Sequence, residues 1–103
     1  MSGARIADSQ MYGHLWGTPD VRAVFEEHAR LQGWLEVLAA LARAQAAEGV
    51  IPASAAEVIT AHAKSELLDL SIVAAETRAS GHSTLGVIRA WRRVLPETAA
   101  AYV

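Results

Sequence analysis

Between Thr77 and Ser83 the sequence gathers side chains suited to binding a small anion. They are the imidazole of His82, the guanidinium of Arg78 and the hydroxyls of Thr77, Ser80 and Ser83. An imidazole and hydroxyl groups can donate hydrogen bonds to a carboxylate, and an arginine can hold one with two parallel hydrogen bonds. A purely structural role for the histidine and the arginine remains an alternative. A histidine in a turn rich in glycine and serine is often an exposed or capping residue, and an arginine near a helix end often neutralises the dipole.

The remaining histidines do not indicate a metal centre. His28 and His62 fall on the apolar sides of expected helices, and no metal-binding partner sits at a fixed offset from either. We interpret both as packed or interface histidines. Trp34 and Trp91 also lie at helical positions, and we expect them to fill core or interface space. The chain has no cysteine, which excludes a disulfide framework and a thiolate metal site. We therefore expect neither a metal nor a cofactor.

The anion-binding candidates interrupt a helical pattern, so helices must position them. The longest expected helix begins at Thr18, where a hydroxyl can cap, Pro19 fixes the first backbone angle and Asp20 complements the dipole. Gly49 offers a left-handed end, and Pro52 prevents continuation. A helix of about 30 residues would be roughly 45 Å long at 1.5 Å per residue.

That length has a consequence for packing. A compact domain of about 100 residues has a radius of gyration near 13 Å, so the helix is expected to extend beyond its own domain. Its apolar stripe recurs at three- and four-residue steps and needs neighbouring helices along its whole length. We therefore expect this chain to self-associate or to pack against further domains.

Shorter helices are expected in the remainder of the chain. Patterns of apolar residues predict helices over 53–64, after the possible cap Asp69, and from Leu85 to Leu95, with another opened by Pro96. No segment alternates as a strand would. The sequence predicts an all-α fold with one long helix and several shorter ones, divided into an amino-terminal arm at 1–17 and a helical domain at 18–103.

Composition restricts the class of protein. The 103 residues are 52% hydrophobic and 19% charged, which indicates one small folded domain. A net charge of -2 gives no general attraction to nucleic acid, and we interpret Arg89, Arg92 and Arg93 beside Trp91 as a solvated face. No apolar run approaches the roughly 20 residues that cross a bilayer, and no secretory leader pattern opens the chain. We expect no membrane partner and a cytoplasmic location.

Six blocks of the sequence have an informative order and spacing, namely 14–25, 30–37, 39–45, 49–52, 76–78 and 81–82. Together they resemble the opening domain of the fumarase/aspartase superfamily, which includes adenylosuccinate lyases and 3-carboxy-cis,cis-muconate cycloisomerases. Block 14–25 resembles the entry segment of the cycloisomerase branch most closely. The next three blocks resemble a long first helix and its exit, and the last two resemble the first substrate-contacting loop.

The resemblance implies an elimination or cycloisomerisation beside a carboxylate-bearing carbon. Such chemistry needs a base and a polar site that holds the resulting dianion. In this family both come mainly from a His-x-Gly-x-Thr/Ser-x-Asp block, a Gly-Ser-Ser loop and a central helix bundle, and this sequence contains none of them. The expected chain is thus an amino-terminal lyase domain without catalytic residues of its own, forming one wall of an active site shared between three subunits.

On that wall the resemblance implies substrate contacts from the anion-binding candidates, with a small di- or tricarboxylate as substrate and the remaining lyase domains or subunits as partners. The implied contacts are His82, Ser83, Ser80, Arg78 and Thr77. Two origins of the chain agree with this resemblance. It is either a piece of a longer enzyme or a naturally split subunit.

The sequence departs from the family pattern at two places. Adenylosuccinate lyases usually carry an Arg-Tyr pair where Leu15 and Trp16 stand, which argues against an adenylosuccinate substrate. Leu38 occupies a position where many relatives have a glutamate. The alternative is a non-catalytic helical oligomerisation or interaction module that keeps the scaffold without the chemistry.

Overall fold

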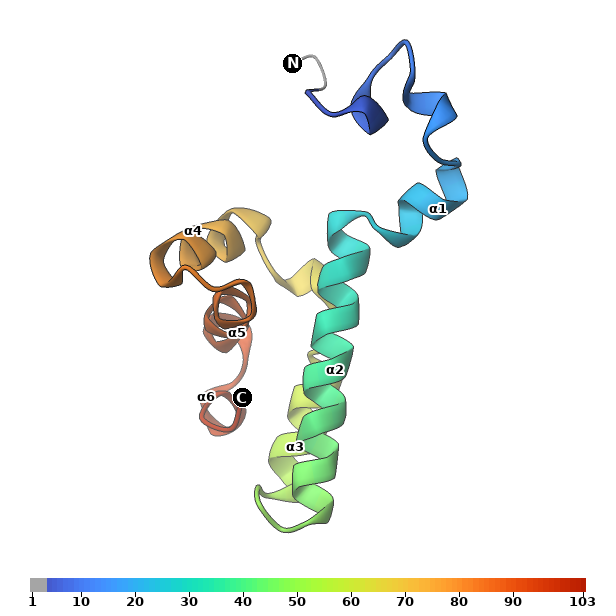
Figure 1. Cartoon of the computed structure of the whole chain (residues 1–103). Coiled ribbons are helices and arrows are strands. Elements are labelled where there is room, and N and C mark those ends of the chain that lie inside the picture. Colours follow the sequence, from blue (N-terminus) through green and yellow to red (C-terminus); the bar gives the residue numbers. More distant parts are fainter. Residues whose placement is uncertain (1–3) are drawn as a thin grey trace. The chain divides into compact units, whose positions relative to one another are not determined.

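The computed structural model describes residues 4–103, and its regular structure is helical throughout that range (Figure 1). This confirms the predicted all-α class. Backbone contacts divide the chain into two units, one ending at Arg30 and the other running from Leu31 to Val103. No helix within 4–103 has the length and apolarity needed to span a bilayer. The α-helices are α1 (Pro19–Val24), α2 (Glu27–Ala47), α3 (Ala53–Ala61), α4 (Leu70–Ser80), α5 (Ser83–Val94) and α6 (Glu97–Ala100).

The first unit has almost no apolar core. Thr18 caps α1 as predicted, because its Oγ1 accepts a hydrogen bond from the Val21 amide at 3.3 Å. The Arg22 guanidinium donates to the Gly13 carbonyl and ties α1 to the preceding 3₁₀ turn. The large apolar side chains of this unit are exposed, namely Ile6, Met11, Tyr12, Leu15, Trp16, Val21, Val24 and Phe25.

The predicted continuous helix from Thr18 to Gly49 is wrong, because α1 and α2 are separated at Phe25 and Glu26. Phe25 leaves the helix with φ −101° and ψ 7°. The Glu26 carboxylate then accepts the amides of His28 at 3.0 Å and Ala29 at 3.3 Å, which satisfies first-turn donors of α2. The hydrogen bond from the His28 amide is the largest of the effects that lower the pKa of Glu26 below its ordinary value.

This break also changes the expected reach of the helix. The 21 residues of α2 span roughly 32 Å at 1.5 Å per residue, shorter than expected. His28, interpreted from the sequence as packed or at an interface, is exposed in its first turn. At its other end, Gly49 has the left-handed φ of +75° that the sequence predicted.

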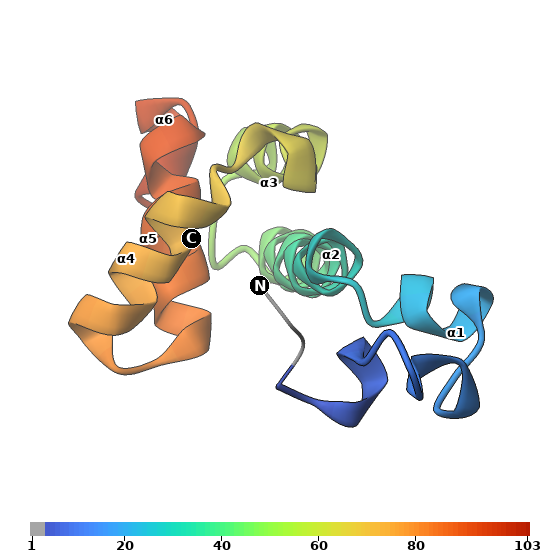
Figure 2. The same cartoon turned by 90° about the horizontal axis from the view of Figure 1, so that it is seen from above.

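The second unit is built around a core shared by several helices. Figure 2 shows α3 beside α2, and the other core residues come from α5 and α6, from Leu68 before α4 and from Leu95 after α5. Trp91, Leu35, Ile59 and Val87 are the largest fully buried side chains. Helix α4 contributes no buried residue and covers the core with half-buried Ile72 and Val73. The buried apolar cluster comprises Leu31, Leu35, Ala39, Ala42, Ala56, Ile59, Leu68, Val87, Ala90, Trp91, Leu95 and Ala99.

A side-chain amide fixes the chain between α3 and α4. Gln32 on α2 donates through Nε2 to the Ala63 carbonyl at 2.8 Å and accepts through Oε1 from the Ser65 amide at 2.8 Å. Ser65 is the buried polar residue of this region. One side chain thus satisfies two backbone groups that no helix satisfies.

Replacing Gln32 by methionine should lower the free energy of unfolding by about 1–3 kcal/mol, because it leaves the Ala63 carbonyl and the Ser65 amide without their partner. Urea unfolding followed by circular dichroism measures the change. The matched control is Gln45→Met on the same helix, because Gln45 is also half-buried and makes no side-chain hydrogen bond within residues 4–103. Equal effects of the two substitutions would show that the Gln32 hydrogen bonds contribute nothing specific.

Candidate functional site

The candidate residues lie around the turn between α4 and α5, two consecutive helices that pack against each other. Asp69 caps α4 as predicted, since its Oδ1 accepts from the Ser71 amide at 2.8 Å and from the Ser71 hydroxyl at 2.6 Å. The hydroxyl hydrogen bond is the main cause that lowers the pKa of Asp69. Gly81 ends α4 with φ +69°, a left-handed angle that suits glycine. Both ends of α4 are therefore capped, and Gly81 defines the backbone where the turn begins.

His82 is the N-cap of α5, and its side chain is exposed. Its Nδ1 accepts a hydrogen bond from the Leu85 amide at 3.3 Å. A ring nitrogen that accepts a hydrogen bond carries no proton, so in the neutral ring Nε2 holds the proton and is the donor. The cap thus selects a tautomer that can donate to a carboxylate.

Ser80 helps to form the turn itself. The Ser80 hydroxyl accepts from the His82 amide at 3.2 Å and lies 3.1 Å from the His82 carbonyl and 3.4 Å from the Thr77 carbonyl. These bonds shape the backbone that carries His82. Ser83 is the first residue of α5 and is exposed, as is Arg78 in the last turn of α4. His82, Ser83 and Arg78 are therefore the candidates accessible to a solute.

Thr77 has a packing role that the sequence did not reveal. It is half-buried against Gly86 of α5, where an added Cβ would lie 2.2 Å from the Thr77 Oγ1 and 2.8 Å from its Cα and N atoms. Only a residue without a side chain fits this crossing. The contact between α4 and α5 thus depends on Gly86, and this close approach fixes the position of the intervening turn.

Ion pairs between a glutamate of α4 and two arginines of α5 join these helices. The Glu76 side chain is 16% exposed, and it pairs with the Arg93 guanidinium and, at 4.0 Å, with that of Arg89. The sequence-based interpretation of these arginines as a solvated face is therefore incomplete, although about half of each side chain is exposed. No motif in the sequence places Glu76 opposite them, because the register between the helices is set by the turn.

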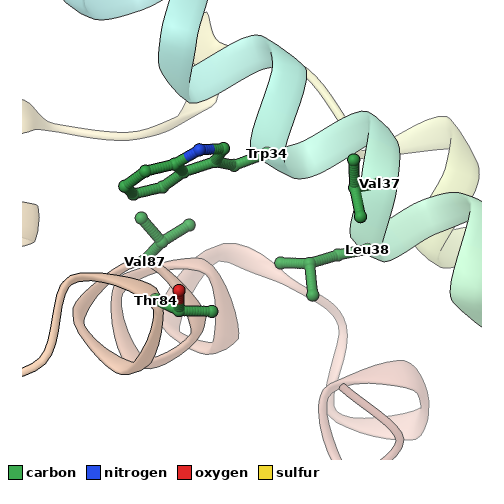
Figure 3. A pocket seen from close by; sticks show the side chains of 5 residues that line it. All are labelled: Trp34, Val37, Leu38, Thr84 and Val87. Atoms are coloured by element: carbon green, nitrogen blue, oxygen red, sulfur yellow. The ribbon is translucent and has the colours of Figure 1, made fainter.

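A separate apolar pocket lies between α2 and α5 (Figure 3). Its volume is about 140 Å³, and it is lined by Trp34, Val37 and Leu38 of α2 and by Thr84 and Val87 of α5. Trp34, expected in the core or at an interface, is 44% exposed at the rim. Thr84 supplies the one hydroxyl among the lining side chains.

Within residues 4–103, no three histidine, aspartate or glutamate side chains lie close enough together to hold a metal ion. The polar groups around His82 suit hydrogen bonding to an anion, and no pair of them is arranged as nucleophile and base. The exposed groups at the turn are thus an imidazole, a hydroxyl and a guanidinium on a helical scaffold.

Comparison with known proteins identifies the class. No family model matches the chain. The 3-carboxy-cis,cis-muconate cycloisomerase of Pseudomonas putida is 36% identical over 87 residues, which cover 84% of this chain and 21% of that protein. The adenylosuccinate lyase of Methanocaldococcus jannaschii is 39% identical over 88 residues, covering 85% of this chain and 19% of that enzyme.

The fold matches as well as the sequence. The crystal structure of the 3-carboxy-cis,cis-muconate lactonizing enzyme from Pseudomonas putida superposes with a TM-score of 0.82 at 33% identity, covering 92% of this chain and 22% of that one. This chain belongs to the fumarase/aspartase superfamily, near the muconate cycloisomerase branch. It spans about a fifth of the length of these relatives.

Proposed function

We propose that this chain serves as the amino-terminal domain of a fumarase/aspartase-type lyase, with residues 18–103 forming one wall of a shared active site. It does not catalyse alone, because the base and the dianion-binding groups of such a reaction come from other parts of the enzyme. The substrate is a small di- or tricarboxylate, and the reaction is an elimination or cycloisomerisation at a carboxylate-bearing carbon. The partners are the remaining lyase domains or subunits.

The observation that carries the proposal is the exposed, tautomer-fixed imidazole of His82. Its Nδ1 is occupied by the Leu85 amide, so its Nε2 is the hydrogen-bond donor toward a substrate carboxylate. Ser83 and Arg78 add an exposed hydroxyl and a permanent positive charge near the same turn. Ser80 and Thr77 act here by shaping the turn and the helix crossing behind it.

In the complete enzyme, formed by joining this chain to the remaining lyase domains, His82→Ala should reduce kcat/KM by about 100-fold, the size of effect seen when one preorganised donor is removed. His82→Asp should cost at least as much. Aspartate preserves an N-cap acceptor for α5, so its loss of turnover cannot be attributed to uncapping. Steady-state kinetics on a carboxylate substrate make the measurement, with circular dichroism to verify folding.

The matched control is His28→Ala, which removes an exposed histidine outside the turn and should leave turnover unchanged. Unaltered turnover in both His82 variants would remove this residue from the proposed site.

A non-catalytic helical interaction module is the second candidate. The exposed apolar side chains Trp34, Val37 and Leu41 on α2 favour it, because such a surface serves association whether or not chemistry survives. This alternative predicts no turnover in any assembly that contains the chain, and no dependence of its binding on His82.

A further inference from the structure

The apolar pocket between α2 and α5 has no part in the proposed active-site wall. All five of its lining residues belong to the second unit, so the pocket lies within one unit of the chain. Val87 of α5 is fully buried, whereas Trp34 and Val37 of α2 are 44% and 68% exposed. The pocket therefore has a floor in the core and a rim that solutes can reach.

The side chains around the pocket offer hydrocarbon surface and one polar group. In Figure 3 the Trp34 indole and the Leu38 side chain reach from α2 toward Val87, and the indole nitrogen lies on the side of the ring away from Val87. Thr84 supplies the one hydroxyl among the lining side chains, and none of the five is charged. A ligand would therefore meet an apolar wall with a single hydrogen-bonding group.

Such a lining holds water weakly. A buried water molecule typically makes about three hydrogen bonds, and these side chains offer one hydroxyl. An apolar ligand would displace loosely held water and would remove its own apolar surface from solvent, and both effects favour binding. A charged group placed inside the pocket would lose hydration without gaining a charged partner.

We propose that this pocket binds one small neutral molecule with a single aromatic ring, and that the Thr84 hydroxyl recognises a hydroxyl on that ring. The pocket volume of about 140 Å³ is close to the roughly 150 Å³ of an apolar cavity that holds one benzene molecule. A bound ring lies against the Trp34 indole, and paired aromatic rings gain stability beyond the area that they bury. A phenolic hydroxyl can both donate to and accept from the Thr84 hydroxyl.

This site is separate from the turn that carries His82, because it takes a neutral ring where the turn offers donors to a carboxylate. The proposal therefore does not rest on the lyase function. Acetate distinguishes the two sites, since it carries a carboxylate without a ring. It should leave the pocket unoccupied at concentrations where benzene or phenol fills it.

Nuclear magnetic resonance on the isotope-labelled full chain tests the proposal, because the Trp34 indole N–H reports directly on the pocket. Titration with benzene and with phenol should each shift this signal until it saturates, and acetate should not. Trp16, which is 62% exposed in the first unit, provides the internal control and should show no saturating shift. The variants Trp34→Phe and Trp16→Phe assign the two signals.

Two variants locate the ligand and its hydroxyl. Leu38→Trp fills the pocket with a larger side chain and should weaken binding of both ligands at least tenfold. Its matched control is Leu41→Trp, at an exposed leucine of the same helix that does not line the pocket. Thr84→Val keeps the shape of the side chain and removes the hydroxyl, so it should weaken phenol binding by about two- to tenfold and leave benzene binding unchanged.

Four results would overturn the proposal. They are the absence of a saturating Trp34 shift, equal shifts of Trp34 and Trp16, a shift of Trp34 by acetate as large as that by benzene, and benzene binding that Leu38→Trp leaves unchanged. Equal loss of phenol and benzene binding in Thr84→Val would contradict the recognition of the hydroxyl. Circular dichroism verifies that each variant folds, and the Thr84→Val comparison decides the matter if Leu38→Trp does not.

Discussion

Trp91→Ala should destabilise the second unit strongly and lower its Tm by more than about 10 °C. The indole is fully buried in the core, and its Nε1 donates to the His62 carbonyl at 3.0 Å. Removing a buried tryptophan side chain costs about 3–5 kcal/mol, whereas a small domain has a total stability of about 5–15 kcal/mol. For a domain of this size the loss corresponds to a fall in Tm of about 12–40 °C. Thermal unfolding followed by circular dichroism measures it.

Two further variants separate packing from hydrogen bonding. Trp91→Phe retains part of the ring and removes the donor to His62, so about 1–3 kcal/mol of the loss should remain. Trp16→Ala removes the same side chain at a position that is 62% exposed, and should leave the Tm of the second unit nearly unchanged. A Tm for Trp91→Ala within a few degrees of the parent would mean that the core can close over the missing ring.

Trp91 also illustrates what the sequence could predict. Its position in a run of apolar residues with helical spacing predicted a packed role, and the structure confirms this. Local signals also predicted several helix ends, because a cap acts within a few residues of itself. Thr18 and Asp69 cap the helices that follow them as expected, and Gly49 has the expected left-handed φ.

Sequence reasoning missed two kinds of feature. Some depend on competition between a helix cap and apolar spacing, and others depend on how the helices align against one another. The break before α2 arises because Glu26 caps a new helix, whereas apolar spacing alone favoured continuation. Trp34 has the same spacing signal as Trp91 but lies at a pocket rim, since periodicity locates an apolar face without stating what covers it. The pairing of Glu76 with Arg93 depends on how α4 and α5 meet across their turn.

The candidate site also has one feature that the sequence could predict and one that it could not. The exposed imidazole of His82 and the cap it forms could be expected from a histidine in a turn beside Gly81. The role of Thr77 could not, because it follows from contact with Gly86, nine positions away on the next helix. Sequence thus identified the residues of the turn, while the helix crossing decides which of them face solvent.

The close approach of α4 and α5 can be tested by a substitution at Gly86. A Cβ at this position would lie 2.8 Å from the Thr77 Cα and N atoms, which are backbone atoms and cannot rotate away. Gly86→Ala should therefore push α4 from α5 and lower the free energy of unfolding by about 1–3 kcal/mol, or more if the helices cannot separate. Urea unfolding gives the size of the loss. The expected sign is opposite to the ordinary effect of replacing a helical glycine by alanine, which stabilises by roughly 0.5–1 kcal/mol.

Gly33→Ala provides the matched control, since Gly33 lies within α2 and a Cβ there would meet no atom within 4 Å. This variant should be neutral or slightly more stable than the parent. Truncating the neighbour, in the double variant Thr77→Ala with Gly86→Ala, should fail to restore stability, because the backbone of residue 77 still blocks the new Cβ. Restoration to the parental stability would instead show that the threonine side chain alone sets the distance between the helices. The same contact would then offer no rigid support to the turn that carries His82.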